Sequence, residues 1–233
     1  MGLELLDSKN PEYFPDPRLS DDHGLIALST ALGTERLLAA YRQGIFPWVK
    51  MEQPPHLWCW YSPNPRMLLY PKEFKTSRSL ARVLKDQKFE IKMDHNFSEV
   101  MRVCASIGRP QQEKSWIEPE MVKDYGLLHQ QGIAHSIEAY EHGRLVGGLY
   151  GLSIGKAFFG ESMFHKETEA SKACMAKLVG IAIHHGLHFI DCQVPNPFLH
   201  SLGAREVPRD TFLSELAKAC SEKPSADYWG TEE

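Results

Sequence analysis

The chain has 233 residues, of which 42% are apolar and 24% charged, and its formal net charge is −4. This composition is that of an ordinary globular protein, and the length suffices for one large domain or two modest ones. The charge excludes a protein that is basic throughout, but it is compatible with a local basic patch. Five scattered cysteines without a CxxC pair predict no disulfide framework or zinc site and favour a reducing cytoplasm. Neither a signal peptide nor a membrane span is predicted.

The N-terminal part begins with an irregular segment, Asn10–Ser20, that is rich in proline and charge. A short helix is expected next, with Thr34 suited to cap its start and Gly44 to end it. Prolines then bracket an aromatic cluster at residues 58–61 and punctuate the chain. We therefore place a boundary near Ser62, between a small N-terminal α+β domain (residues 1–62) and a larger domain (residues 63–233).

A basic segment follows this boundary. Between Arg66 and Lys92, eight residues are basic and only three are acidic. Ser77 is suited to cap a helix within it. Steps of four and three residues place three cations of this helix on one face, namely Arg78, Arg82 and Lys85.

The rest of the chain predicts a mixed sheet. Helical spacing at 97–104 and 119–132 is followed by a change to strand periodicity. An antiparallel meander is predicted from three strands, at 136–140, 145–152 and 157–164. A helix over 168–185 and a short apolar strand over 187–192 then predict a crossover and a parallel strand pair. The predicted fold class is α+β, with helices flanking the mixed sheet of the larger domain.

Three polar residues at the ends of predicted strands are the candidate catalytic residues. Asp191 and Gln193 follow a helix and a strand, at the edge where open α/β sheets bind ligands, and alternation puts both on one face and Cys192 on the other. Glu161 ends another strand among aromatic residues, where a carboxylate without a partner is unfavourable. The competing structural interpretations are that Asp191 caps the next loop and that Glu161 points outward at a sheet edge.

Two other chemistries are weaker interpretations. Cys192 could be a nucleophile, but no adjacent base is identifiable, so a buried inert thiol is favoured. His184, His185 and His188 straddle a helix end, and no third type of ligand is spaced to join them. No metal site is therefore predicted.

The turn before the helix at 168–185 bears on the acyl donor. It lacks the glycines with which acyl-CoA enzymes hold a pyrophosphate, and it carries Glu167 and Glu169. CoA is therefore disfavoured. The basic segment could instead lie along a phosphate backbone, while tryptophans stack on an unpaired 3′ base; the candidates for stacking are Trp48, Trp58, Trp60 and Trp116. The structural alternative is a solvated helix and core tryptophans.

Seven ordered motifs resemble the bacterial leucyl/phenylalanyl-tRNA–protein transferases. The resemblance runs from about Gly24 to Arg209, some four-fifths of the chain. Its motifs are Tyr41–Trp48, Trp60–Arg66, Ser115–Ile117, His135–Glu138, Leu145–Gly151, Gly160–Phe164 and Ile190–Gln193. The family has a C-terminal domain similar to the GNAT acyltransferases behind a small family-specific domain, which implies a GNAT-like aminoacyl-transfer domain here.

The resemblance also implies an activity and its residues. It implies transfer of Leu or Phe, and sometimes Met, from aminoacyl-tRNA to protein N-termini that begin with Lys or Arg, which creates a degradation signal. Asp191 and Gln193 would act on the attacking amine, with Glu161 in the same polar site. The implied substrate-binding residues are Tyr41, Trp48, Trp116, Leu149, Phe158 and Ile190. In the family methionine is common where Leu149 stands. The proposed tRNA-binding residues are Arg66, Lys75, Arg78, Arg82 and Lys85. We expect no cofactor, no membrane association, and a monomer.

Two alternatives remain in view at this point. The chain could be a non-catalytic RNA-binding module on a decayed acyltransferase scaffold, against which Glu161, Asp191 and Gln193 together argue. It could also be an N-acetyltransferase that uses acyl-CoA, against which the missing glycine turn argues. Because the donor ester is already activated, the main task of the enzyme is positioning, and we expect Asp191 to orient Gln193 and the amine.

Overall fold

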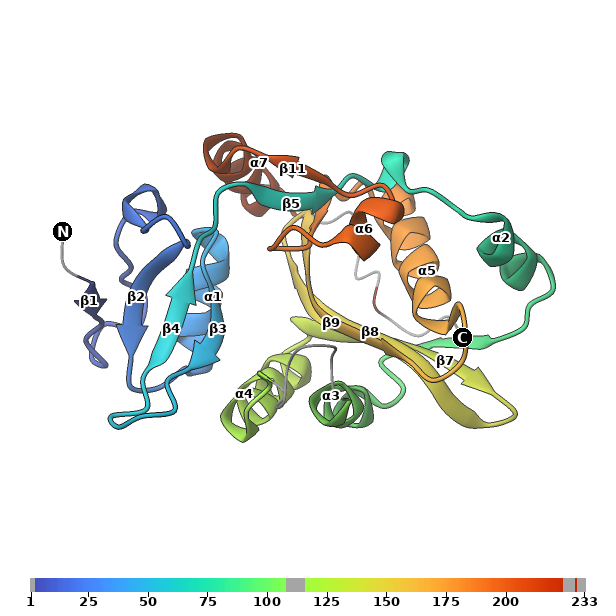
Figure 1. The fold of residues 1–233 in the computed structure, drawn as a ribbon, viewed down its shortest axis with the longest axis horizontal. Helices are drawn as coiled ribbons and strands as arrows, with labels where there is room; N and C mark the ends of the chain where they lie inside the picture. The colour runs from blue at the N-terminus through green and yellow to red at the C-terminus, as the bar shows by residue number, and fades with distance from the viewer. Residues whose placement is uncertain (1–2, 108–115, 224–228, 230–233) are drawn as a thin grey trace.

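The structure is a computed structural model that describes residues 3–107, 116–223 and 229. In this part of the chain the strands form two sheets, which Figure 1 shows side by side. The smaller sheet has the order β1-β2-β4-β3 and the larger has the order β11-β5-β10-β9-β8-β7-β6. The chain passes from the smaller to the larger sheet over residues 62–65.

The smaller sheet carries its own helix. Its strands are β1 (Glu4–Leu5), β2 (Leu25–Ser29), β3 (Phe46–Lys50) and β4 (Trp58–Tyr61), and α1 spans Thr34–Arg42. A short 3-10 helix, η1, spans Pro17–Leu19. Trp58 and Trp60 are fully buried and donate their indole N–H groups to Glu120 and Ser29. These two tryptophans are therefore core residues, as the structural alternative holds.

The larger sheet is mixed, as the sequence predicts. Its strands are β5 (Arg66–Leu69), β6 (Glu90–Met93), β7 (Ala134–Glu141), β8 (Arg144–Ile154), β9 (Ala157–His165), β10 (Phe189–Asp191) and β11 (Arg205–Val207). The meander β7–β8–β9 is antiparallel, and β10 pairs with β9 in parallel after the crossover through α5 (Ala170–His185). Both predictions are confirmed.

Helices cover both faces of this sheet (Figure 1). On one face lie α5 and the short α6 (Pro197–Ser201), with α2 (Arg78–Lys85) packed against α5. On the other face lie α3 (Phe97–Ser106) and α4 (Pro119–Gln130). A 3-10 helix, η2 (Pro71–Glu73), precedes α2, and α7 (Arg209–Ser221) follows β11. The predicted α+β fold, a mixed sheet flanked by helices behind a smaller unit, is confirmed.

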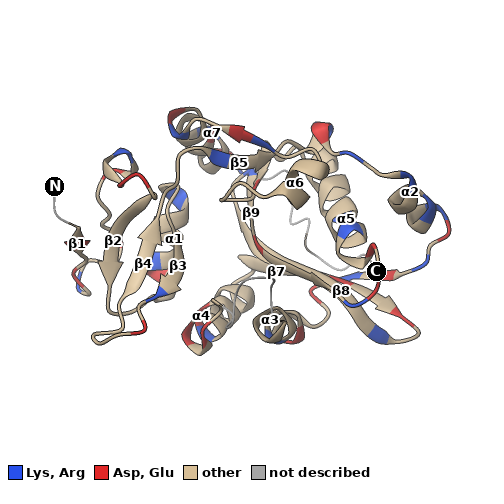
Figure 2. Cartoon of the chain, in the orientation of Figure 1, with Lys and Arg blue, Asp and Glu red and all other residues tan. Residues whose placement is uncertain are grey.

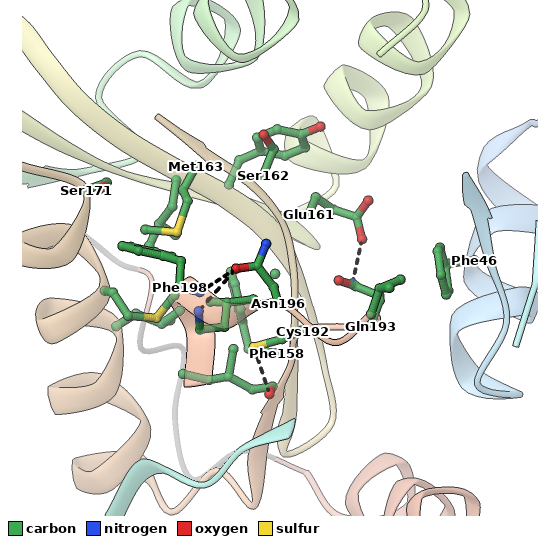
Figure 3. A pocket seen from close by; sticks show the side chains of 18 of the residues that line it. Phe46, Phe158, Glu161, Ser162, Met163, Ser171, Cys192, Gln193, Asn196 and Phe198 are labelled. Carbon is green, nitrogen blue, oxygen red and sulfur yellow. Dashed lines mark hydrogen bonds between the residues drawn. The ribbon is translucent and has the colours of Figure 1, made fainter. Parts of the chain in front are cut away.

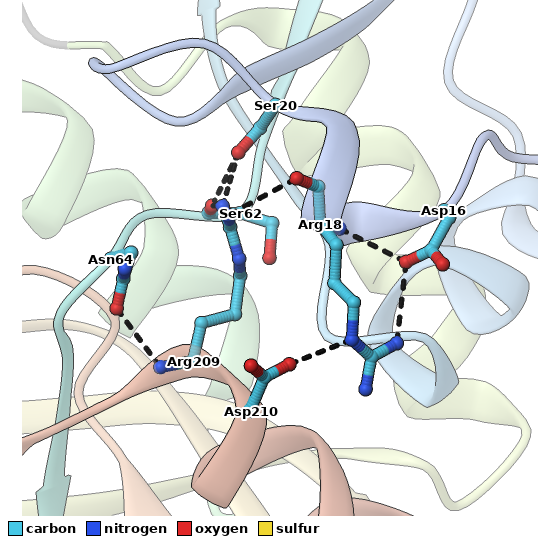
Figure 4. Close-up of polar contacts among 7 residues, drawn as sticks. All are labelled: Asp16, Arg18, Ser20, Ser62, Asn64, Arg209 and Asp210. Atoms are coloured by element: carbon cyan, nitrogen blue, oxygen red, sulfur yellow. Dashed lines mark hydrogen bonds and ion pairs between the residues drawn. The ribbon is translucent and has the colours of Figure 1, made fainter.

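The connection over 62–65 is held by a polar cluster that Figure 4 shows. The Arg209 side chain donates to Ser20 and to the carbonyl of Ser62, and its backbone N–H donates to Asn64. Nearby, Arg18 donates to Asp210 at 2.6 Å. Because these bonds join η1, the connection and the start of α7, they fix how the two sheets face each other.

Candidate active site

A cavity lies where β3 of the smaller sheet faces the opening between β9 and β10 of the larger one. Its volume is about 470 Å³, within the range of small-molecule sites. One part is aromatic, with Phe46, Trp48 and Trp116. Another part is apolar and includes Leu149, Phe158, Met163, Met175, Leu178, Ile190 and Phe198. Glu161 and Gln193 also line it and hydrogen-bond to each other, as Figure 3 shows.

Glu161 reaches the cavity because it is the extra residue of a β-bulge. Tyr150 pairs with Ser162 and Gly151 pairs with Gly160, so Glu161 has no partner on β8. Such bulges bend a strand and redirect a side chain. Gly151 makes this geometry possible, since an added Cβ would lie 2.1 Å from the carbonyl oxygen of Phe159.

The Glu161 carboxylate is held by neutral donors. Tyr41 donates to Oε1 at 2.7 Å, Tyr125 donates to Oε2 at 3.1 Å, and the Gln193 amide donates to Oε1 at 3.2 Å. Burial raises the pKa of Glu161 to about 7, against the opposing effect of the two phenols. This carboxyl group therefore exchanges its proton near neutral pH.

Asp191, by contrast, is fully buried and paired with a cation. Arg66 donates from Nε at 2.9 Å and from Nη2 at 2.6 Å to the two carboxylate oxygens, in a bidentate ion pair. The guanidinium lies between the rings of Phe46 and Phe212, 4.8 Å and 4.4 Å from their centroids. Arg66 also donates to the carbonyl of Gly44. The pair thus joins β5 and β10 to the smaller sheet.

The backbone after β10 explains where Gln193 points. The strand ends at Asp191, and Gln193 has a left-handed φ of 56°. Its N–H donates to Asp191 Oδ1 at 3.0 Å, while its side chain reaches Glu161. Cys192 and Gln193 line the cavity and Asp191 does not. The predicted shared face of Asp191 and Gln193 is therefore wrong, because alternation ends with the strand.

The candidate substrate-binding residues divide into two groups. Five of them line the cavity: Trp48, Trp116, Leu149, Phe158 and Ile190. Ser115, beside Trp116, lies outside the described residues. Tyr41 is fully buried behind Glu161 and does not line the cavity, which corrects its expected place against a substrate.

The candidate tRNA-binding residues are also divided. Lys75, Arg78, Arg82 and Lys85 are exposed, and the last three lie on α2, where Figure 2 colours the basic residues blue. Arg66 is corrected: a fully buried guanidinium bound to Asp191 does not face a nucleic acid. A count of basic residues in the sequence treats each of them as exposed, and here that assumption fails for one.

Other chemistries gain no support. Burial raises the pKa of the Cys192 thiol well above its usual range, which disfavours the nucleophilic thiolate. Over the described residues, no cluster of His, Cys, Asp or Glu is arranged to hold a metal ion. In the same part of the chain, no helix is long and apolar enough to cross a bilayer.

The start of α5 is acidic. Glu169 stands at the N-cap with a left-handed φ of 71°, and its carboxylate accepts from Ser79 and Lys172, each at 3.0 Å. The helix N-terminus favours an anion, and here a side chain of the protein itself supplies the negative charge. A pyrophosphate would be repelled at this end, in line with the missing glycine turn.

Sequence reasoning missed Tyr125 as part of the site. Its place among the apolar positions of α4 indicated core, and it is indeed fully buried. Its hydroxyl nevertheless meets Tyr41 and Glu161. Nothing in the spacing of α4 indicates this contact, because the bulge that brings Glu161 there depends on β8 and β9 together.

Comparisons with known proteins agree with the motifs. The family model "Leucyl/phenylalanyl-tRNA protein transferase" matches residues 68–217, and that of its N-terminal domain matches residues 31–64. The Leucyl/phenylalanyl-tRNA--protein transferase of Dechloromonas aromatica (strain RCB) is 47% identical over 95% of this chain and 94% of the relative. That of Desulfatibacillum aliphaticivorans is 47% identical over 94% of this chain and 93% of the relative.

Similarity to solved structures is looser. FemX is 11% identical, with a TM-score of 0.45 over 76% of this chain and 67% of that chain. The ribosomal-protein-alanine N-acetyltransferase from Brucella melitensis biovar Abortus 2308 is 16% identical, with a TM-score of 0.34 over 47% of this chain and 81% of that chain. The family matches and the relatives at 47% identity show that this chain belongs to the leucyl/phenylalanyl-tRNA protein transferase family and is an aminoacyltransferase.

Proposed function

We propose that the protein transfers Leu or Phe, with Met as a further donor, from aminoacyl-tRNA to the α-amine of proteins that begin with Lys or Arg. It acts as a monomer in the cytoplasm, and its product is a degradation signal. The observation that carries this proposal is one continuous cavity with an aromatic part, an apolar part, and Glu161 and Gln193 beside them. The acceptor preference and the fate of the product follow from the family resemblance.

The aromatic part suits the 3′ end of the donor. Trp48 and Trp116 are half-buried at the cavity, so parts of their rings are accessible. Stacking of an unpaired base on such a ring contributes about 1–3 kcal/mol. The exposed cations of α2 and Lys75 would hold the phosphate backbone further from the cavity.

The apolar part suits the side chain of the donor amino acid. Leu149, Phe158 and Ile190 line it and bring no charge, and Met163 and Met175 add flexible apolar surface. Such a pocket accepts Leu, Phe and Met and disfavours polar side chains, whose burial without a partner is unfavourable.

Catalysis rests mainly on position. The donor ester is activated, and orienting an amine and an ester can contribute roughly 7–11 kcal/mol. Gln193 would orient the amine, and Asp191 would act indirectly by fixing the backbone of Gln193. Asp191→Asn and Gln193→Ala should therefore lower turnover far more than donor affinity. Normal turnover in both would remove this assignment.

One experiment separates the proposed function from its alternatives. The protein is incubated with an Arg-started peptide and either tRNA charged with labelled leucine or labelled acetyl-CoA. Label from tRNA alone supports aminoacyl transfer, and label from acetyl-CoA would support an N-acetyltransferase. Transfer from neither, with tRNA still bound, would support the RNA-binding module.

A further inference from the structure

Three oxygen-bearing side chains meet behind the cavity, and each contacts the other two. Tyr41 and Tyr125 place their hydroxyl oxygens 2.5 Å apart, and each lies within hydrogen-bond distance of the Glu161 carboxylate, at 2.7 Å and 3.1 Å. The phenols come from α1 and α4, and Glu161 comes from the bulge of β9. The three contacts form a closed triangle.

A count of protons shows that this triangle can hold one more proton. Each hydrogen bond needs one proton, and the two phenols supply two protons for three contacts. With Glu161 ionised, one contact therefore joins two oxygens with no proton between them. With Glu161 protonated, three protons serve three contacts around the ring. The arrangement thus provides a place for one additional proton.

The other groups around Glu161 do not prevent it from taking up this proton. The nearest charges are Asp191 and Arg66, which oppose each other in a bidentate pair. Gln193 adds a neutral donor. In the described part of the chain, Glu161 supplies the one carboxylate that lines the cavity.

We propose that the Glu161 carboxylate is the catalytic base that takes the proton from the α-ammonium group of the acceptor, with Tyr41 and Tyr125 as positioning residues that hold it. This role rests on the proposed function. It differs from an assignment of base chemistry to Asp191, whose two oxygens are occupied by Arg66 and which does not line the cavity.

The step balances as follows. The acceptor ammonium gives one proton to Glu161, which becomes a neutral carboxyl group, and the amine becomes neutral. The amine nitrogen then attacks the ester carbonyl, the new C–N bond forms, and the C–O bond to the ribose breaks. The second proton of the nitrogen goes to the departing ribose oxygen, which leaves as a hydroxyl. Glu161 returns its proton to water.

The acidities of the two groups support this transfer. An α-ammonium group has a pKa near about 7.7–8.0. Burial raises the pKa of Glu161 to about 7, so the proton moves between groups of similar acidity. A base whose pKa lies near the working pH is the most effective kind.

The test is single-turnover transfer to an Arg-started peptide at saturating charged tRNA, measured against pH. We expect the wild-type rate to rise with pH through about 7 and then level. Glu161→Gln should be slower by about 5- to 10-fold near pH 7, where roughly a tenth of an amine with a pKa of about 7.7–8.0 is already neutral, and its rate should keep rising as the amine loses its proton to water. An unchanged rate and pH profile in Glu161→Gln would overturn the proposal.

A second acceptor separates a base from a structural residue. In a second acceptor peptide, the N-terminal α-amine is replaced by a hydrazide group, whose nucleophilic nitrogen is already neutral at neutral pH. This peptide should react with wild type and Glu161→Gln at similar rates. An equal deficit of the variant with both acceptors would overturn the proposal. The matched control is Glu138→Gln, which alters a buried carboxylate on β7 that does not line the cavity and should keep the wild-type pH profile.

Tyr125→Phe tests the triangle without altering Glu161. It removes a hydroxyl that donates to the ionised carboxylate of Glu161. The midpoint of the pH profile should therefore move to higher pH, and an unchanged or lower midpoint would overturn the role of Tyr125. Failure of the wild-type protein to transfer at all would instead remove the proposed function.

Discussion

Asp191 and Glu161 stand on neighbouring parallel strands, β10 and β9, yet their surroundings differ in charge. Asp191 is enclosed and bound at both oxygens by Arg66. Glu161 faces a cavity and is bound by neutral donors from Tyr41, Tyr125 and Gln193. A carboxylate held at both oxygens by a counter-charge holds structure, whereas one that faces a cavity and is bound by neutral donors can exchange a proton. This difference indicates that Asp191 stabilises the structure and that Glu161 takes part in the chemistry.

The largest expected effect is a loss of protein stability when the ion pair of Asp191 is broken. Arg66→Met leaves Asp191 buried without its cation, which should lower the free energy of unfolding by about 3–5 kcal/mol. Urea unfolding measures this loss. The double variant Arg66→Met/Asp191→Leu should regain part of it, because the lone buried charge is gone. Wild-type stability in the single variant would contradict a structural ion pair.

The position of Glu161 should depend on the β-bulge of its strand. In Gly151→Ala the new Cβ would lie 2.1 Å from the Phe159 carbonyl oxygen, so we expect a loss of about 1–3 kcal/mol in stability together with reduced transfer. Its control is Gly180→Ala in α5, where an added Cβ meets nothing within 4 Å. That control should be neutral or slightly stabilising. Equal behaviour of both variants would argue against a bulge that depends on glycine.

Substitutions on the surface of α2 should affect tRNA binding without disturbing Asp191 or Glu161 at the strand ends. Reversal of Arg78 and Arg82 to Glu should weaken tRNA binding and reduce its slope against log salt by about 2. Filter binding at several salt concentrations measures this slope. Arg102→Glu, on the opposite side of the larger sheet in α3, is a charge-reversal control. Equal slopes for the double and control variants would move the tRNA surface elsewhere.

A substitution in the apolar part of the cavity should change only the specificity for the donor amino acid. Leu149→Phe fills space beside the donor side chain, so phenylalanyl donors should lose up to about tenfold relative to leucyl donors. Competition between the two charged tRNAs gives the ratio. Leu149→Met, which nearly preserves volume, should leave it unchanged. A constant ratio in Leu149→Phe would mean that Leu149 does not face the donor.

Much of the larger sheet was predictable because its signals are local. Turns with glycine separate β7, β8 and β9, and the helix between β9 and β10 requires a crossover. β5 was missed. Its four residues, Arg66–Leu69, are all buried, so they show no alternation, and β5 pairs with β10 and β11 from far along the chain. Pairings between distant segments leave no pattern in either segment alone.

The sequence predicted which residues form the site but only part of their arrangement. The motifs indicated Glu161, Asp191 and Gln193, and the structure brings their main chains and side chains together. Their different roles could not be predicted, because these depend on the burial of Arg66 and on the contact of Tyr125 with Glu161. Both features arise only when separate elements pack.

The most direct measurement is the protonation of the two carboxyl groups by infrared spectroscopy with isotope-labelled side chains. Because burial raises its pKa to about 7, Glu161 should keep its proton above the range of an ordinary carboxyl group and lose it as the pH rises through about 7. The band of this neutral carboxyl should be absent in Glu161→Gln and present in Asp191→Asn. A band that survives in Glu161→Gln and disappears in Asp191→Asn would contradict the division of roles.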